Sequence, residues 1–295
     1  MLGKIVGDIK SLNIQGATNI AFAGLVALRG VISDSRFKNR SALIRGLERA
    51  RDLLSSARPN EPMLYNVVDY VISKVVESTG DFRADGLRAI DFVSDCVNNA
   101  KKRLAVNGKN FIKKGSTILT HCHASNVTEV LKAAKSNIKG VFCTETRPVY
   151  QGRITARELL SAGLKVTMSV DSAVVNYLKS VDYCLIGCDV ISSTYVVNKV
   201  GSRALSILCN KYDVPFYVCA LSYKFSPESV SGVNSDLELR SPDEVWAERP
   251  RRLKVFNPAF DVVDFENITG FITEKGVLPP QVLINTLKQR NSVFD

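Results

Sequence analysis

The chain has 295 residues, of which 45% are hydrophobic and 23% charged, and its formal net charge is +10. This is the composition of an ordinary globular protein that can bury one large core or two modest ones. No apolar run approaches the roughly 20 residues of a membrane span, and the N-terminus lacks the apolar segment and cleavage site of a signal peptide. We therefore expect a cytoplasmic protein with no membrane partner.

Residues 1 to about 110 have a helical pattern. Apolar residues recur three and four positions apart in "NIAFAGLVAL", "SALIRGLERARDLLSSA" and "MLYNVVDYVISKVVE". The segment "SSARPNEP" interrupts the pattern, because two prolines and an asparagine oppose a continuous helix. We predict a helical N-terminal domain over residues 1–110.

The pattern changes at about residue 111. Short apolar, β-branched runs alternate with helical stretches; the runs are "STILTHC", "GVFCTET", "LKVTMSV", "DYCLIGC" and "PFYVCAL". Strands that are apolar throughout and separated by helices are typical of a parallel sheet covered on both faces. The sequence therefore predicts an α/β fold in which residues 111–295 form a doubly wound, Rossmann-like domain, without the GxGxxG motif of a dinucleotide site.

Ligands of such sheets bind beyond the carboxyl ends of the strands. The residues that follow the predicted strands are polar or titratable, and they include Cys122, Arg147, Gln151, Asp171, Asp189, Asn198, Lys199 and Lys224. In a basic chain this edge favours an anionic small molecule, with lysine or arginine binding phosphate. The helix dipole and a nearby cation would stabilise a thiolate here. With a carboxylate facing it, the pair has the base and acid that aldose–ketose proton transfer needs.

Each of these residues also has a purely structural interpretation. Cys122 is of a type that is often a small buried apolar residue, and Asp171 could cap the helix that it opens. Asp189 could terminate a turn, and Asn198 and Lys199 could form a surface turn. Their joint placement at successive strand ends favours a site.

The other chemistry-bearing residues do not indicate a metal or a disulfide. The seven cysteines show no CxxC pair and mostly lie in apolar runs, as reduced, buried thiols do. A zinc site at His121, Cys122 and His123 is disfavoured, because adjacent residues of a strand point to opposite faces. We therefore expect no metal and no cofactor. The basic residues are dispersed, so we also expect no nucleic acid partner.

Several stretches resemble a known superfamily over nearly the whole chain: "ILTHCHAS", "TETRPVYQGRITARELLSAG", "DSAVVNYLKSVDYCLIGCDVI" and "VVNKVGSRALSILCNKYDVPFYVCALSYKFSPES". This superfamily joins the regulatory α, β and δ subunits of translation initiation factor 2B with methylthioribose-1-phosphate isomerase and archaeal ribose-1,5-bisphosphate isomerase. The segments "TRPVYQG", "DSA" and "YKFSPES" resemble the last of these most. The resemblance implies conversion of ribose 1,5-bisphosphate to ribulose 1,5-bisphosphate in AMP salvage.

The resemblance also implies roles for individual residues. Cys122 in "THC" corresponds to the proton acceptor of the isomerases, and Asp189 to their proton donor. The positions that correspond to substrate-binding residues are Gln15, Gly16, Ala17, Thr18, Arg58, Gln151, Asn198, Lys199 and Lys224. Regulatory subunits typically lack the cysteine and the aspartate, so their retention favours an enzyme.

Two positions depart from the isomerase pattern. Gln15 stands in place of an arginine, and after "THCH" the isomerases continue with Ser-Lys, whereas Ala124, Ser125 and Asn126 follow here. The loss of a guanidinium removes a bidentate phosphate contact. Two alternatives therefore stay open: an isomerase of a pentose monophosphate such as methylthioribose 1-phosphate, and a non-catalytic protein related to initiation factor 2B.

The resemblance implies partners as well. The substrate would be a phosphorylated sugar, AMP would act as an activator, and the chain would form a homodimer or a hexamer. The regulatory alternative instead implies binding to initiation factor 2.

Overall fold

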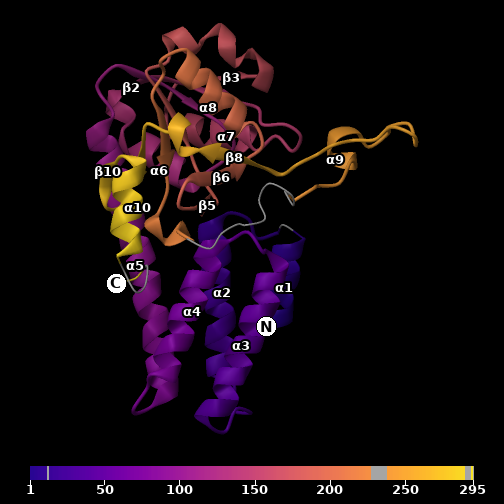
Figure 1. Ribbon diagram of the computed structural model, residues 1–295, viewed down its shortest axis with the longest axis vertical. Helices are drawn as coiled ribbons and strands as arrows, with labels where there is room; N and C mark the ends of the chain where they lie inside the picture. The colour runs from indigo at the N-terminus through magenta and orange to yellow at the C-terminus, as the bar shows by residue number, and fades with distance from the viewer. Residues whose placement is uncertain (12, 227–237, 290–293, 295) are drawn as a thin grey trace. The chain divides into compact units, whose positions relative to one another are not determined.

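The computed structural model describes residues 1–11, 13–226, 238–289 and 294, which form two compact units (Figure 1). The first unit consists of residues 1–100, 223–225 and the end of the chain from residue 289. The second consists of residues 101–222 and 226–288. The division falls within one long helix, α5 (Phe82–Phe111), and the domain boundary at residue 110 stays a prediction.

The first unit is helical, as its apolar periodicity predicts. Its elements are α1 (Leu2–Lys10), α2 (Ala17–Ile32), α3 (Arg40–Ala57), α4 (Pro62–Val76) and most of α5. The apolar side chains of α3 recur on one face, where Leu43, Leu47 and Leu54 are fully buried. The predicted break is confirmed, because α3 ends at Ala57 and Pro62 opens α4, where a missing N–H breaks no helical bond.

A seven-stranded sheet forms the centre of the second unit. Its strands are β1 (Ser116–Thr120), β2 (Ile138–Thr144), β3 (Val166–Ser169), β4 (Tyr183–Ile186), β7 (Phe216–Cys219), β9 (Gly270–Thr273) and β10 (Gly276–Leu278). Their order is β10-β9-β7-β4-β1-β2-β3, and every pair is parallel except β9 with β10. The predicted doubly wound α/β architecture is confirmed.

Helices alternate with the strands, and one of them, α10 (Pro280–Lys288), follows the last strand. Those of at least nine residues are α6 (Ser125–Ala133), α7 (Gly152–Ser161), α8 (Ser202–Lys211) and α10. Short 3-10 helices span 135–137, 171–176, 178–180, 222–224 and 265–267. The stretch "SAVVNYLKS" therefore forms two 3-10 helices rather than one continuous α-helix. In the described residues, no helix has the length and apolarity that crossing a bilayer requires.

The stretch "VVNK", whose Asn198 and Lys199 were predicted at the ligand edge of the sheet, is not a strand of the main sheet. It forms β6 (Tyr195–Lys199), which pairs antiparallel with β5 (Val190–Ile191) and β8 (Phe260–Asp264) in a separate three-stranded sheet. The physical reason is the short turn between β5 and β6, in which the Ser192 hydroxyl accepts from the N–H groups of Thr194 and Tyr195. A turn this short allows only antiparallel pairing.

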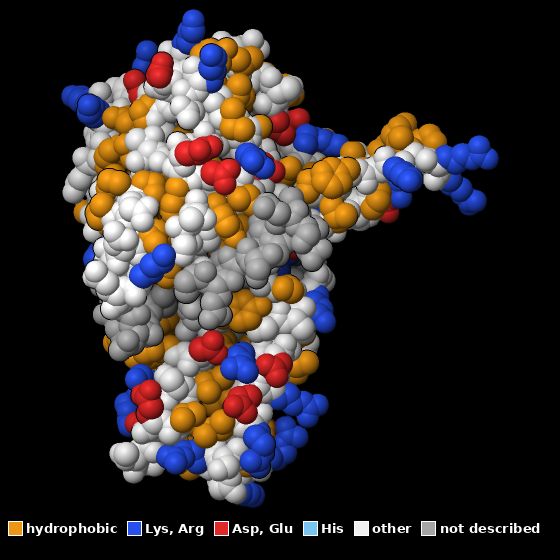
Figure 2. All heavy atoms as spheres, viewed as in Figure 1, with side chains coloured by type: hydrophobic (Ala, Val, Ile, Leu, Met, Phe, Trp, Pro, Cys, Tyr) orange, Lys and Arg blue, Asp and Glu red, His pale blue; other side chains and the backbone are white. Residues whose placement is uncertain are grey.

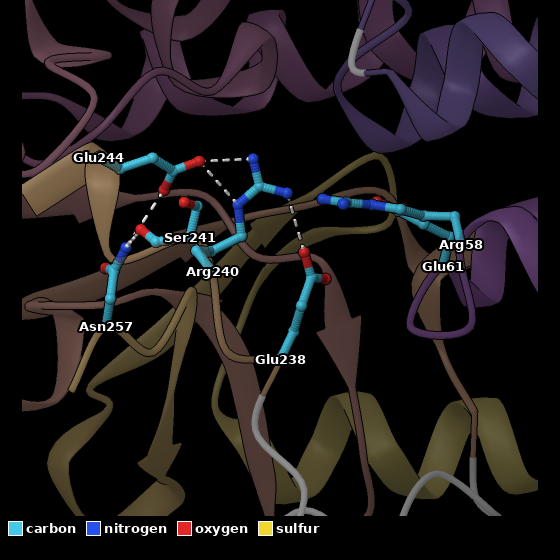
Figure 3. A network of polar contacts seen from close by, with 7 residues as sticks. All are labelled: Arg58, Glu61, Glu238, Arg240, Ser241, Glu244 and Asn257. Atoms are coloured by element: carbon cyan, nitrogen blue, oxygen red, sulfur yellow. Dashed lines mark hydrogen bonds and ion pairs between the residues drawn. The ribbon is translucent and has the colours of Figure 1, made fainter. Parts of the chain in front are cut away.

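Residues 238–258 form a long excursion before β8, and we call it the 238–258 loop. Its base is closed by backbone bonds from Arg240 to Asn257 and from Ala259 to Glu238. Figure 3 shows the Arg240 guanidinium between the Glu244 carboxylate, at 2.7 Å, and the Glu238 carboxylate, at 3.4 Å. The loop carries the one-turn helix α9 (Asp243–Trp246).

Candidate active site

The main sheet reverses its strand order between β1 and β4. From β1 the chain adds β2 and β3 on one side, and then returns to place β4 and β7 on the other. Such a reversal is where doubly wound sheets leave a crevice for ligands. Cys122 follows β1 and Asp189 follows β4, so the two predicted catalytic residues lie at adjacent strand ends on either side of the reversal.

Threonine side chains surround the backbone of Cys122. The Cys122 N–H donates to Thr146 Oγ1 at 2.9 Å, and Thr155 Oγ1 donates to the Cys122 carbonyl at 2.8 Å. Thr146 follows β2 and Thr155 lies in α7, and both are buried. The end of β1 is therefore tied to the end of β2 and to the helix that follows it.

The Cys122 thiol differs from its predicted state. Burial raises its pKa to about 12, and the nearby carboxylates of Asp189 and Asp171 raise the pKa further. The backbone N–H of His123 and the charge of Lys199 oppose this rise. Lys199 acts in the predicted direction, but desolvation outweighs Lys199 and the His123 N–H together, so the predicted thiolate is disfavoured in the ligand-free protein.

The two histidines have structural partners. His121 is 4% exposed, and its Nε2 lies 2.8 Å from the Val200 carbonyl while Nδ1 lies 2.6 Å from Thr144 Oγ1. Burial lowers the pKa of His121, which favours the neutral ring with Nε2–H donating and Nδ1 accepting. His123 Nδ1 lies 3.1 Å from Thr155 Oγ1 and 3.8 Å from the Glu158 carboxylate.

Asp171 does not cap the helix that it opens, contrary to the structural alternative. Its two carboxylate oxygens accept from the backbone N–H groups of Thr146, at 2.8 Å, and Arg147, at 2.7 Å. These bonds hold the loop after β2 against the end of β3. The loop "TETRP" is thus not a solvated turn at Thr146, which is fully buried.

The remaining predicted residues of the second unit are Lys199, Asn198 and Gln151. Lys199 ends β6 and is close enough to lower the pKa of both Cys122 and His121. Asn198 is buried and its side-chain amide donates to Ser202 Oγ at 2.7 Å. Gln151 precedes α7, and its buried Oε1 has no hydrogen-bond partner in the described structure, which suits an acceptor for a ligand hydroxyl.

The other predicted residues belong to the first unit. Gly16 is the N-cap residue of α2 with a φ of 83°, Ala17 and Thr18 are buried in the first turn, and Gln15 is exposed. Arg58 is the C-cap residue of α3 and pairs with the Glu61 carboxylate at 3.6 Å; both residues are labelled in Figure 3. Lys224 is 7% exposed.

Comparisons with known proteins are consistent with this geometry. The model of the Initiation factor 2 subunit family matches residues 13–280. The chain belongs to this family. It is 37% identical to ribose 1,5-bisphosphate isomerase of Methanocaldococcus jannaschii over 92% of this chain and 90% of that protein. It is 31% identical to methylthioribose-1-phosphate isomerase of Thermoanaerobacter over 95% of this chain and 88% of that protein.

A solved structure of the same family has the same fold. The Pyrococcus horikoshii OT3 protein described as translation initiation factor eIF-2B superimposes with a TM-score of 0.83 at 27% identity, covering 96% of this chain and 98% of that one. The chain is thus similar both to proteins named as enzymes and to a protein named as an initiation factor. Function has to be argued from the site rather than from the fold.

The residues that hold Cys122 were not predicted from the sequence. Thr146 and Thr155 were not singled out, although "TET" at the end of the second strand offered a hint, since polar side chains there are placed at the ligand edge. Nothing in the sequence around Thr155 indicates its contact with a residue 33 positions away. The part of the chain that the structure describes contains no cluster of three His, Cys, Asp or Glu side chains able to hold a metal ion.

Proposed function

We propose that this member of the Initiation factor 2 subunit family is an aldose–ketose isomerase that converts ribose 1,5-bisphosphate to ribulose 1,5-bisphosphate. The observation that carries the proposal is the placement of Cys122 and Asp189 at the two strand ends that flank the reversal of the sheet. The relatives named as isomerases share 31% and 37% identity with the chain over nearly its full length.

The two side chains supply the two roles that the reaction requires. The Asp189 carboxyl protonates the ring oxygen as the bond from C1 to that oxygen breaks, and the Cys122 thiolate removes the proton from C2. This leaves an enol with a hydroxyl on C2 and the phosphate still on the oxygen of C1. The Cys122 thiol then protonates C1, and Asp189 recovers a proton from the 2-hydroxyl. Both groups end in the state in which they began, so no cofactor or external proton is consumed.

This cycle needs one proton on the pair in total. The ligand-free protein favours the thiol, because burial raises the pKa of Cys122 to about 12. The reactive form carries the same total charge but has the proton on Asp189 instead. Its population therefore depends on the relative proton affinities of the two groups, not on the pH between their pKa values. Lys199 and the His123 N–H favour the reactive form, since both stabilise the thiolate.

The proposal includes phosphate binding. The start of α2 at Gly16 offers backbone N–H groups and the positive end of a 16-residue helix. In the second unit, Lys199 supplies a cation, and Asn198 and Gln151 supply amides for the sugar hydroxyls. Because Gln15 carries no charge, the alternative substrate is a pentose monophosphate such as methylthioribose 1-phosphate.

The proposal is tested by proton NMR of the protein with ribose 1,5-bisphosphate in D₂O, with and without AMP. We expect ribulose 1,5-bisphosphate to form, and we expect Cys122→Ser and Asp189→Asn each to lower kcat by about 10³-fold. Cys96→Ser, at a half-buried thiol in the first unit, is the matched control and should keep wild-type turnover. Undiminished turnover in either site variant would contradict the assigned chemistry.

A regulatory role is the second candidate, supported by the likeness to the protein described as an initiation factor. Under this alternative, the protein turns over neither ribose 1,5-bisphosphate nor a pentose monophosphate, and it retains initiation factor 2 in a pull-down at low salt. Turnover that is lost in Cys122→Ser would count against it.

The proposal includes a cytoplasmic homo-oligomer, a dimer or a hexamer. The 238–258 loop supports this, because Leu239, Trp246, Leu253 and Phe256 are between 45% and 77% exposed, a density of apolar surface that is typical of an interface. Figure 2 shows hydrophobic side chains gathered over this loop beside basic ones. Light scattering after gel filtration should give a mass at least twice the 32.4 kDa of one chain; a monomer would rule the assembly out.

A further inference from the structure

Cys122 has a backbone conformation that its residue type disfavours. Its φ is 67°, in the left-handed region that residues with a Cβ rarely adopt. Thr146, after the neighbouring strand, has a φ of 62°, and a β-branched residue is still less suited to this region. Such conformations persist only where surrounding contacts determine them, and they cluster at functional sites.

Two buried hydroxyls hold the peptide groups of Cys122. Thr146 Oγ1 accepts from the Cys122 N–H at 2.9 Å, and Thr155 Oγ1 donates to its carbonyl at 2.8 Å. The two threonines are 0% and 1% exposed, so water has no ready access to replace either bond. Both backbone polar groups of a strained residue are therefore satisfied by side chains from other elements.

Each threonine is fixed in turn by a further group. The Asp171 carboxylate accepts from the backbone N–H of Thr146 at 2.8 Å, which holds Thr146 in its left-handed conformation. Thr155 Oγ1 uses its hydrogen on the Cys122 carbonyl, and it therefore accepts from His123 Nδ1–H at 3.1 Å. The contacts run from the end of β3 through the end of β2 to Cys122, and on to α7.

We propose that Thr146 and Thr155 are positioning residues for the Cys122 thiol. They hold the Cys122 peptide in its left-handed conformation. This keeps the thiol desolvated at the point where the strand order reverses between β1 and β4. The inference deepens the proposed function and rests on it. Neither threonine needs to touch the substrate, since each acts on the backbone of Cys122.

The test compares Thr146→Val and Thr155→Val with Thr146→Ser and Thr155→Ser, which restore the hydroxyl. We expect each valine variant to lower kcat by about 100-fold with KM changed less than about threefold, because a displacement of the reacting group on the order of 1 Å costs that much. Each serine variant should recover kcat to within about tenfold of wild type. Thr155 lies in a helix and has an ordinary negative φ, so valine fits its backbone. Thr155→Val therefore tests the inference even if Thr146→Val does not fold.

The matched control is Thr273→Val at the end of β9, three strands from β1. Thr273 is 0% exposed, and its hydroxyl likewise accepts from a backbone N–H, that of Lys275 at 3.0 Å, and donates to a carbonyl, that of Gly276 at 3.1 Å. We expect it to lose stability but not kcat. An equal loss of kcat in the control and the site variants would overturn the inference, and so would unchanged kcat in both valine variants.

A second measurement does not depend on turnover. Alkylation of Cys122 by iodoacetamide, followed by peptide mass spectrometry from pH 7 to 10, reports how strongly the thiol is desolvated. Release of either threonine contact should admit water and speed alkylation at pH 8 by about tenfold, whereas Thr273→Val should leave the rate unchanged. If the wild-type protein turns over no sugar phosphate, the proposed function fails, and the alkylation rates still decide whether the threonines position the thiol.

Discussion

Two helix starts carry candidate site residues, and they are built in opposite ways. Before α6, the conformation of Cys122 depends on hydroxyls from distant segments, Thr146 and Thr155. Before α2, the chain turns at Gly16, which has a φ of 83° and no side-chain hydrogen bond at the cap. The first region is determined by tertiary contacts, and the second by the conformational freedom of one residue. They should therefore respond differently to a single added methyl group.

Glycine-to-alanine substitutions test this difference directly. At Gly152, beside the Cys122 region, an added Cβ would lie 1.8 Å from the Thr144 carbonyl oxygen. Because a backbone atom cannot yield cheaply, we expect Gly152→Ala to lower the free energy of unfolding by about 3 kcal/mol. Gly16→Ala meets nothing within 4 Å but keeps a disfavoured φ, so we expect a loss of about 2 kcal/mol.

The matched control is Gly7→Ala in α1, where an added Cβ also meets nothing within 4 Å and the backbone is ordinary helix. It should stabilise the protein by about 0.5 kcal/mol. Urea unfolding followed by circular dichroism measures all three. Equal losses at Gly152 and Gly16 would show that close packing does not distinguish the two regions.

The region before α2 is tested by adding a positive charge at Gln15, where the isomerases carry an arginine. Gln15→Arg adds a guanidinium next to the start of α2, where it can bind phosphate through two parallel hydrogen bonds. We expect KM for ribose 1,5-bisphosphate to fall by about tenfold, equivalent to about 1.4 kcal/mol, with kcat little changed. Gln15→Lys, which adds charge without the bidentate geometry, should gain less. A KM unchanged in both variants would argue that Gln15 does not face the substrate.

The same contrast explains how much the sequence could predict. The positions of the strands, and of Cys122 and Asp189 after them, follow from apolar runs and their spacing, which are local signals. The reversal of strand order between β1 and β4 was not predicted, because it depends on pairing between segments far apart in the chain. The residues that hold Cys122 could not be predicted this way, because Thr146 and Thr155 lie 24 and 33 positions from it. The protonation of the thiol was also beyond the sequence, since desolvation depends on atoms packed around the sulfur from several segments.

The separate sheet of β5, β6 and β8 was missed for a related reason. The apolar run of β6 resembles the buried strands around it, and only the Ser192 turn reveals that it pairs antiparallel. Asp171 likewise has the pattern of a helix cap, and its contact with Thr146 depends on the register between β2 and β3. Patterns within one segment predict its type, while pairing between segments decides what its polar residues bind.

The smallest expected effect is on the pH dependence of the unfolding free energy, to which the Cys122 region contributes a titrating thiol and the Gly16 region contributes none. The pKa of the folded Cys122 thiol is about 12, against an ordinary value of 9.0, so between these values the folded chain binds a proton that the unfolded chain has lost. Stability from this group is therefore fully present below pH 9 and declines as the pH rises above it.

The wild-type protein should lose about 1 kcal/mol of unfolding free energy between pH 8 and pH 10 relative to Cys122→Ser, whose side chain does not titrate in this range. The two proteins should show parallel pH profiles below pH 8. Gly16→Ala provides the control from the other region, because it removes no titrating group and should follow the wild-type profile with a constant offset. Urea unfolding at each pH gives the three curves. Parallel profiles for wild type and Cys122→Ser up to pH 10 would mean that the thiol is solvated in the folded chain, and that the contacts around Cys122 position it without excluding water.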